Sequence, residues 1–261
     1  MKEATYNRYR FDALGIQASV EPAKVTFGKV TFGFADGRMD LSGTVNAAGE
    51  GGHLALNVMA SGINASRILA MVGTDASVAA GKIDGAAIVE LTGKTPNDGL
   101  GTSGGELVLS MTGGKVARQF LESASTDARQ LFRKAAGYAS VDCLLGVANL
   151  HNGIASISPL RLRTSDGNLS GGGQLDLRRE TMNLVLRSDS KSTEFWALDV
   201  PLHLTGSLTN PRIEPLTGLG GSKPESEGVG NLHELSPNLR KLTDSRCHSR
   251  WAGNASVPQQ A

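Results

Sequence analysis

The amino-acid sequence predicts a mainly β protein, a long curved antiparallel sheet with one long and one short α-helix. Short segments in which apolar and polar residues alternate recur over residues 1–215, and this is the pattern of half-buried strands. The dipeptides Asp36-Gly37, Asn152-Gly153 and Asp166-Gly167 lie between such segments and indicate hairpin turns. Glycine makes up 33 of the 261 residues, so we expect it at turns, bulges and close backbone approaches.

The first strands are expected from about Val25 onward. The segment after Asp36-Gly37 would place Met39, Leu41 and Val45 on one face, and residues 54–58 and 107–111 repeat the alternation. An apolar residue followed by Ser or Thr and then Gly recurs at irregular spacing, which predicts strand-end bulges or, alternatively, a duplicated strand unit. The five copies are Leu41-Ser42-Gly43, Leu91-Thr92-Gly93, Met111-Thr112-Gly113, Leu169-Ser170-Gly171 and Leu204-Thr205-Gly206.

Residues 141–208 carry the clearest strand pattern. Alternating segments at 160–163, 175–177, 182–186 and 202–204 are separated by turn signals. They predict an antiparallel meander with one polar and one apolar face.

Two helices are expected to interrupt the strands. Asn64 or Ser66 can cap a short helix that ends near Val72, and apolar residues three or four apart predict a longer helix from about 116 to 136, within 115–137. This helix would join two sub-repeats, 1–113 and 141–215, of one domain that spans 1–215. Residues 216–261 are rich in Gly, Ser, Pro and Asn and predict a disordered tail, in which Leu232, Leu235, Leu239 and Leu242 could form a transient helical turn.

Charge and composition exclude several classes of function. Lys plus Arg number 26 and Asp plus Glu number 25, and aromatic residues make up 5% of the chain. We therefore expect no nucleic-acid partner, because neither a basic face nor a stacking platform is present. Cys143 and Cys247 lie 104 residues apart without a near partner, so we predict neither a disulfide framework nor a metal site, and no compartment follows from them.

The sequence shows neither an apolar run of about 18 residues nor a signal peptide at its start. Taken literally, such a chain stays where it is made, and taken as a fragment it has lost the segment that targeted it.

Motifs for catalysis are weak. Residues 101–105 match the serine-hydrolase pattern G-x-S-x-G around Ser103, but they lead into a strand rather than a helix, so a flexible loop is the expectation. The five histidines form no ligand-spaced pair, and Gly171-Gly172-Gly173 fits a strand bulge better than a phosphate cradle. We predict no enzyme, no cofactor and no metal site.

About ten predicted strands offer an apolar face, and two helices are too few to cover them. The sheet must either close on itself around an ordinary core or form an open trough, whose apolar lining would suit acyl chains.

The ordered motifs resemble the C-terminal region of the AsmA family over about residues 10–215. They are the 107–116 strand, the helix after it, Asp142-Cys143-Leu144, the run from Leu160 to Leu177, and the closing segment 200–211 with its P-L-x-x-x-G-[ST]-L-x-N-P signature. The Asp36-Gly37 hairpin and the helix from Gly62 to Leu69 fit as well.

This resemblance implies a non-enzymatic envelope protein at the periplasmic face of the inner membrane, with a role in outer-membrane biogenesis. It also implies an N-terminal membrane anchor, and since this sequence shows none, we expect a fragment or a truncated form. Larger relatives resemble bridge-like lipid carriers, so the expected partners are phospholipid acyl chains. The alternative is a scaffold that acts through envelope proteins without lipid transfer. The residues expected to line the groove are Leu107, Leu109, Met111, Leu160, Leu162, Leu175, Leu177, Leu184, Leu186, Leu202 and Leu204.

Overall fold

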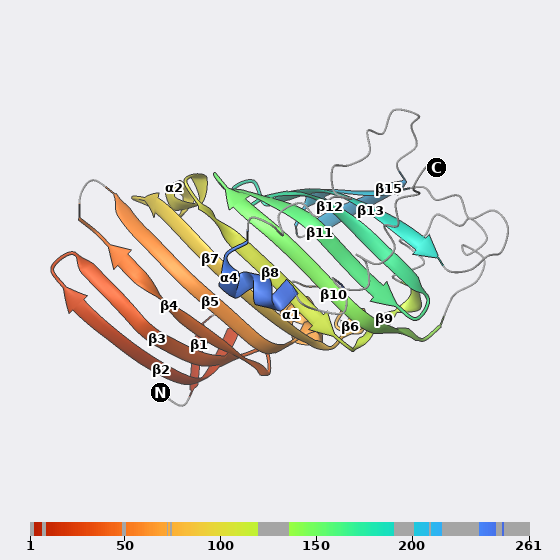
Figure 1. Cartoon of the computed structure of the whole chain (residues 1–261), viewed down its shortest axis with the longest axis horizontal. Coiled ribbons are helices and arrows are strands. Elements are labelled where there is room, and N and C mark those ends of the chain that lie inside the picture. The colour runs from red at the N-terminus through yellow and green to blue at the C-terminus, as the bar shows by residue number, and fades with distance from the viewer. Residues whose placement is uncertain are drawn as a thin grey trace, which may run out of the picture.

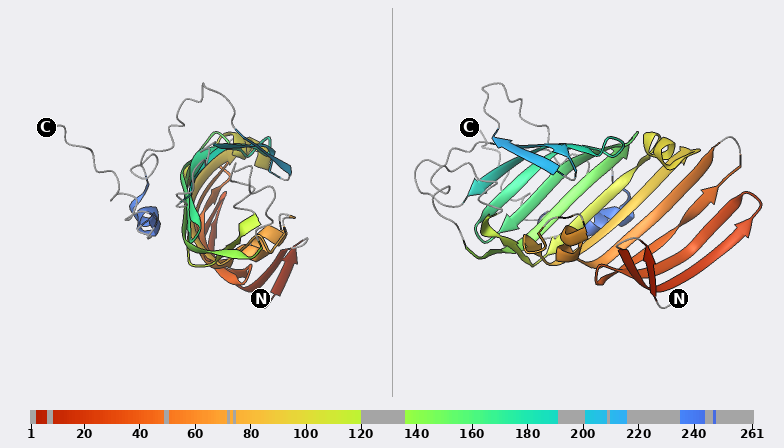
Figure 2. Two further views of the ribbon diagram at one scale, coloured as in Figure 1. Left: turned by 90° about the vertical axis from the view of Figure 1, so that its right-hand side faces the viewer. Right: turned by 180° about the vertical axis from the view of Figure 1, so that it is seen from behind.

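A computed structural model describes residues 3–6, 9–48, 51–71, 73, 75–119, 136–190, 201–208, 210–215, 235–243 and 247. These residues form one 15-stranded antiparallel sheet in which the main strands follow chain order from β1 to β15. The sheet curls into an open C when seen along its long axis (Figure 2, left). Within the described residues its first and last strands do not pair. The predicted mainly β fold with a curved antiparallel sheet is confirmed.

The strands lie side by side in a single diagonal array (Figure 1). Two short strands, β6 and β9, pair with each other, and β9 also pairs with β10. The strands are β1 (Glu3–Tyr6), β2 (Tyr9–Glu21), β3 (Lys24–Phe34), β4 (Gly37–Asn46), β5 (Gly52–Asn64), β6 (Ala79–Ala80), β7 (Lys82–Gly93), β8 (Gly104–Thr112), β9 (Lys115–Ala117), β10 (Tyr138–His151), β11 (Ile154–Thr164), β12 (Gly167–Asp176), β13 (Thr181–Ser190), β14 (Leu202–Ser207) and β15 (Asn210–Pro215). The helices are α1 (Ala65–Met71), α2 (Pro96–Gly101) and α4 (Pro237–Thr243).

Short turns connect most neighbouring strands, as the sequence predicts. Asn152 and Gly153 both have positive φ, 51° and 82°, which suits the tight turns favoured in hairpins. At the first and third predicted turns the structure differs by one residue. The first is made by Ala35 and Asp36, while Gly37 already pairs with Phe34 in the ladder. The third is made by Ser165 and Asp166, and Gly167 already begins β12.

The helices differ from the prediction at two places. The short helix is confirmed as α1, where the Asn64 side chain accepts a hydrogen bond from the N–H of Ser66 at 3.1 Å. The long helix does not begin at 115, because 115–117 form β9, where Val116 pairs with Ala79 and Ala139. Residues 118 and 119 are helical and residues 136 and 137 are not, while residues 120–135 lie outside the described residues. The helix α2 was not predicted.

The described part of the predicted tail is also different. Leu235 and α4 pack on the sheet, and Cys247 forms a disulfide with Cys143. The prediction that these cysteines form no disulfide is therefore wrong. It rested on their 104-residue separation, which the fold closes to a Cα–Cα distance of 5.7 Å.

Candidate functional site: the two faces of the sheet

The strand register assigns alternate residues to opposite faces of the sheet. The α4 helix lies outside the curve (Figure 2, left) and packs on Val108, Leu145 and Val147, so these residues mark the convex face. Their neighbours along the strands, such as Leu107 and Leu109, therefore point to the concave face.

The concave face is apolar along the sheet. Ten of the eleven leucines and methionines predicted to line a groove share it, because they pair with one another or with the same neighbours across β8, β10, β11, β12, β13 and β14. The eleventh, Leu177, follows the end of β12 in a turn, where its N–H donates to the carbonyl of Gly153. These ten are Leu107, Leu109, Met111, Leu160, Leu162, Leu175, Leu184, Leu186, Leu202 and Leu204.

The same face continues through the N-terminal strands. By register, Leu54, Leu56 and Val58 of β5 face the same side as Ala87, which pairs with Leu107. At the far end Phe11 contacts Phe32 and Phe34, with ring centroids 5.4 and 5.8 Å apart. The concave lining therefore extends from β2 to β14.

Exposure along the concave face is uneven. Leu107 and Leu109 keep 37% and 39% of their surface exposed, although they lie in the middle of the sheet. Toward β13 and β14 the lining is closed by its own side chains, because Leu186 and Leu202 are buried against Leu160, Leu169 and Leu204. Met111 is buried too, against Val116 of β9. The lining is thus open at β8 and filled by its own side chains near the C-terminal strands.

Glycines on the concave face permit the curvature of the sheet. A Cβ atom on Gly43 would collide with the carbonyl oxygen of Ala55 on β5, and one on Gly105 would collide with that of Ile88 on β7. Gly43 lies within β4 and Gly105 is the second residue of β8, and at both positions alternation would otherwise place an apolar side chain on the concave face. Glycine therefore lets neighbouring backbones approach where the sheet bends.

The convex face carries a second cluster, beneath α4. Leu235 and Leu239 are each 2% exposed and pack on Val108, Leu145 and Val147. The backbone N–H of Ser236 donates to the Glu106 carboxylate at 2.9 Å, and the Cys143–Cys247 disulfide fixes the chain beyond the helix. Sequence alone indicated a helical turn here but not the face that it covers.

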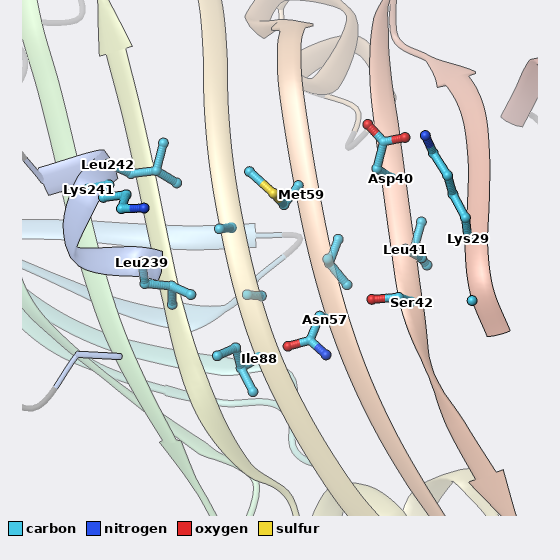
Figure 3. Close-up of a pocket in the computed structure, with 14 residues that line it drawn as sticks. Lys29, Asp40, Leu41, Ser42, Asn57, Met59, Ile88, Leu239, Lys241 and Leu242 are labelled. Carbon is cyan, nitrogen blue, oxygen red and sulfur yellow. The ribbon is translucent and has the colours of Figure 1, made fainter. Parts of the chain in front are cut away.

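Beside α4 the convex face has a hollow of about 640 Å³ (Figure 3). Apolar side chains come from both the sheet and the helix, and Met59 is 53% exposed. Two lysines, Lys29 and Lys241, lie at opposite sides of it. The hollow's carboxylate, Asp40, is paired with Arg38 at 2.9 Å, which lowers the pKa of Asp40 through the hydrogen bond. The other labelled residues are Leu41, Ser42, Asn57, Ile88, Leu239 and Leu242.

One long rim of the sheet is held by ion pairs. Asp36 in the β3–β4 turn contacts Arg67 of α1 at 3.1 Å, and Asp166 in the β11–β12 turn contacts Arg118 at 2.7 Å. In each case the hydrogen bond from the arginine is the main reason that the carboxyl pKa lies below its ordinary value.

The serine of the G-x-S-x-G pattern has a structural position. Ser103 is 1% exposed, its hydroxyl donates to the carbonyl of Leu100 at 2.7 Å, and it accepts from the N–H of Gly153 at 3.0 Å. The segment follows α2 and is not the flexible loop that we expected. A buried hydroxyl with both partners in the backbone has no access to a substrate.

The remaining polar groups do not gather into a metal site in the part of the chain that the structure describes. Within the described residues no three His, Cys, Asp or Glu side chains lie close enough to hold a metal ion. His203 contacts Asn183 at 2.6 Å on the convex side of β13 and β14. The described helices are all too short or too polar to cross a bilayer.

Comparisons with protein-family models, with curated proteins and with solved structures find no match to this chain. Its fold and faces define an open, curved β-sheet protein with an apolar concave lining and a helix fastened to its convex face.

Proposed function

We propose that this protein is a non-enzymatic, AsmA-like module that shields phospholipid acyl chains on the concave face of its sheet. The observation that carries the proposal is the apolar lining with Leu107 and Leu109 more than a third exposed in its middle. Soluble proteins rarely leave a wide apolar surface uncovered without a ligand or partner for it.

The length of the face suits such a ligand. Thirteen strands follow one another along the sheet, and neighbouring strands are about 4.8 Å apart. The lining is thus longer than the hydrocarbon core of a bilayer, about 30 Å, and could shield a whole acyl chain from water.

The disulfide supports an envelope location. Disulfide bonds persist in oxidising compartments such as the bacterial periplasm and are rare in the cytosol. The Cys143–Cys247 bond is therefore in keeping with the periplasmic face of the inner membrane, which the AsmA resemblance implies, and with a role in outer-membrane biogenesis.

The test compares two charged substitutions at exposed apolar positions on opposite faces. Leu109→Glu places a carboxylate in the concave lining, and Met59→Glu is the matched control on the convex face. Uptake of phospholipid from vesicles is followed by fluorescence and by mass spectrometry of the extracted protein. We expect Leu109→Glu to weaken uptake at least about tenfold, since burying a carboxylate against acyl chains costs more than 1.4 kcal/mol.

Met59→Glu should leave uptake unchanged. Wild-type protein that carries no lipid and takes up none from vesicles would end this proposal, as would equal loss in both variants.

A second candidate is a scaffold that binds envelope proteins, and the convex hollow favours it. Met59, Leu239 and Leu242 form an apolar floor between Lys29 and Lys241, which suits an acidic amphipathic peptide. This function predicts the opposite result, with partner capture lost in Met59→Glu and kept in Leu109→Glu, and no lipid bound to either.

A further inference from the structure

The two edges of the sheet are chemically different. At the C-terminal edge, Ser207 and Asn210 face each other in the β14–β15 ladder with two residues between them in sequence, which makes them a hydrogen-bonded pair. The alternation along the ladder then turns the backbone groups of Pro211, Ile213 and Pro215 outward. Proline has no N–H, so this edge keeps a single outward donor, at Ile213, and is poorly suited to accept another strand.

Among the residues that the structure describes, the N-terminal edge has no strand beside it over residues 15–21. Strand β1 pairs with Tyr9–Asp12 of β2 only, and among the described residues no strand pairs with the outer edge of residues 15–21. Ile16 and Val20 are 59% and 77% exposed there. The segment contains neither proline nor lysine, two residues that usually protect an edge strand.

The outward groups of this edge follow from the turn at its end. Glu21 pairs with Lys24 across the two-residue turn at Pro22 and Ala23, so these two form a hydrogen-bonded pair. Counting back along β2, which has no extra residue between 16 and 21, the N–H and C=O groups of Ile16, Ala18 and Val20 point away from β3.

We propose that this edge is a dimer interface, at which β2 pairs antiparallel with β2 of a second copy about a twofold axis at Ala18. The edge is complementary to itself. Ala18 faces its own counterpart, and Ile16 faces Val20 of the other chain on the concave side, so that every outward N–H meets an outward C=O. On the convex side Gln17 faces Ser19, which can hydrogen-bond, and no like charges are opposed.

The proposed β2–β2 pairing does not depend on what the concave face binds, but it would bring the concave faces of the two copies together. A twofold axis perpendicular to the sheet keeps both concave faces on one side, so the two apolar linings would join into one. Because the C-terminal edges are blocked by Pro211 and Pro215, association stops at two copies rather than growing into a filament.

Light scattering on the lipid-free protein tests the interface. We expect a particle of twice the 27.2 kDa chain mass, and Ala18→Pro, which removes an outward N–H, should halve it. Ile213→Pro removes the remaining outward N–H of the other edge and is the matched control, with no effect on mass. A monomeric wild type, or a dimer that survives Ala18→Pro, would overturn the proposal.

Cross-linking tests the register without relying on proline. Cys143 and Cys247 are paired and no other cysteine is present, so an introduced cysteine is the sole free thiol. Ala18→Cys would place two Cα atoms about 5.5 Å apart, within disulfide range, and should give a covalent dimer on mild oxidation. Ile16→Cys would hold its two thiols about 13 Å apart and should not form a covalent dimer. A covalent dimer of Ile16→Cys in place of Ala18→Cys would disprove this register.

Discussion

A single buried side chain, Ser103, holds together two neighbouring turns on one rim of the sheet, the α2–β8 turn and the β10–β11 turn. Ser103 links two turns that are 50 residues apart in sequence, because its hydroxyl bonds both the carbonyl of Leu100 at the end of α2 and the N–H of Gly153. Asn152, the other turn residue, donates its N–H to the carbonyl of Ser103 at 2.7 Å. The Ser103 hydroxyl therefore satisfies the N–H of Gly153, which would otherwise be buried without a partner. The carbonyl of Leu100 also accepts from the backbone N–H of Ser103 at 3.2 Å.

Removal of this hydroxyl should cost stability and not activity. Ser103→Ala leaves the N–H of Gly153 buried and unpaired, which typically costs about 1–3 kcal/mol. Denaturant unfolding should show this loss, while Ser61→Ala on the exposed side of β5 should change little. Any esterase activity in a preparation should be the same in wild type and Ser103→Ala. A selective loss of activity in a fully folded variant would instead revive the hydrolase hypothesis.

At the scale of elements, α4 is too short to be stable alone and depends on its attachments. Leu235 and Leu239 bury their side chains on the convex face, and the disulfide ties Cys247 to Cys143 in the middle of β10. The disulfide closes a loop between two residues 104 positions apart, and a covalent loop of this length strongly restricts the conformations of the unfolded chain. The disulfide and the apolar contacts thus act together to hold the segment over Val108 and Val147.

Reduction should therefore destabilise the protein. In the chain-entropy model a loop of about 100 residues contributes about 4.7 kcal/mol, and removal of a native disulfide typically costs about 2–5 kcal/mol. Denaturant unfolding with and without reductant measures the difference. A Cys143→Ala, Cys247→Ala variant should match the reduced wild type and should not respond to reductant. Equal stability of oxidised and reduced protein would mean that α4 is held by its apolar contacts alone.

Local sequence patterns could predict the faces of the strands, because side chains alternate with a period of two whatever the curvature. Leu109 and Leu160, for example, follow from alternation alone. The interactions that the sequence did not predict are long-range. Val116 has helical spacing to residues after it, yet it pairs with Ala79 and Ala139 in β9, since tertiary pairing outweighs a local preference. The Cys143–Cys247 bond likewise required the fold to bring distant segments together.

Local patterns also fail to predict which side chains of the concave face are buried. Alternation predicts which side chains share it, but not that Leu186 and Leu202 would be buried by neighbours while Leu107 and Leu109 stay exposed. This difference depends on how closely side chains of distant strands approach one another. Close approach between strands depends in turn on glycines such as Gly43, where a Cβ atom would collide with the backbone of β5.

For the whole molecule, charge is nearly balanced, with 26 basic and 25 acidic side chains. The arginines of several ion pairs hold the pKa of Asp36, Asp40 and Asp166 below the ordinary value of 3.8. A carboxyl group with a lower pKa in the folded state stabilises the fold above its unfolded pKa, and this contribution is lost as the pH falls through the folded value. Acid also leaves the basic groups uncompensated and mutually repulsive.

We therefore expect the melting temperature to be nearly constant from pH 7 to about 5 and to fall as the pH drops below about 4. Thermal unfolding followed by circular dichroism across this range measures it. The variant Asp36→Asn, Asp40→Asn, Asp166→Asn should melt lower at neutral pH and show a shallower decline in acid. Added salt should weaken the effect in wild type, because these pairs are exposed and screened. An acid decline that is as steep in the variant as in wild type would show that other carboxylates control the stability of the sheet.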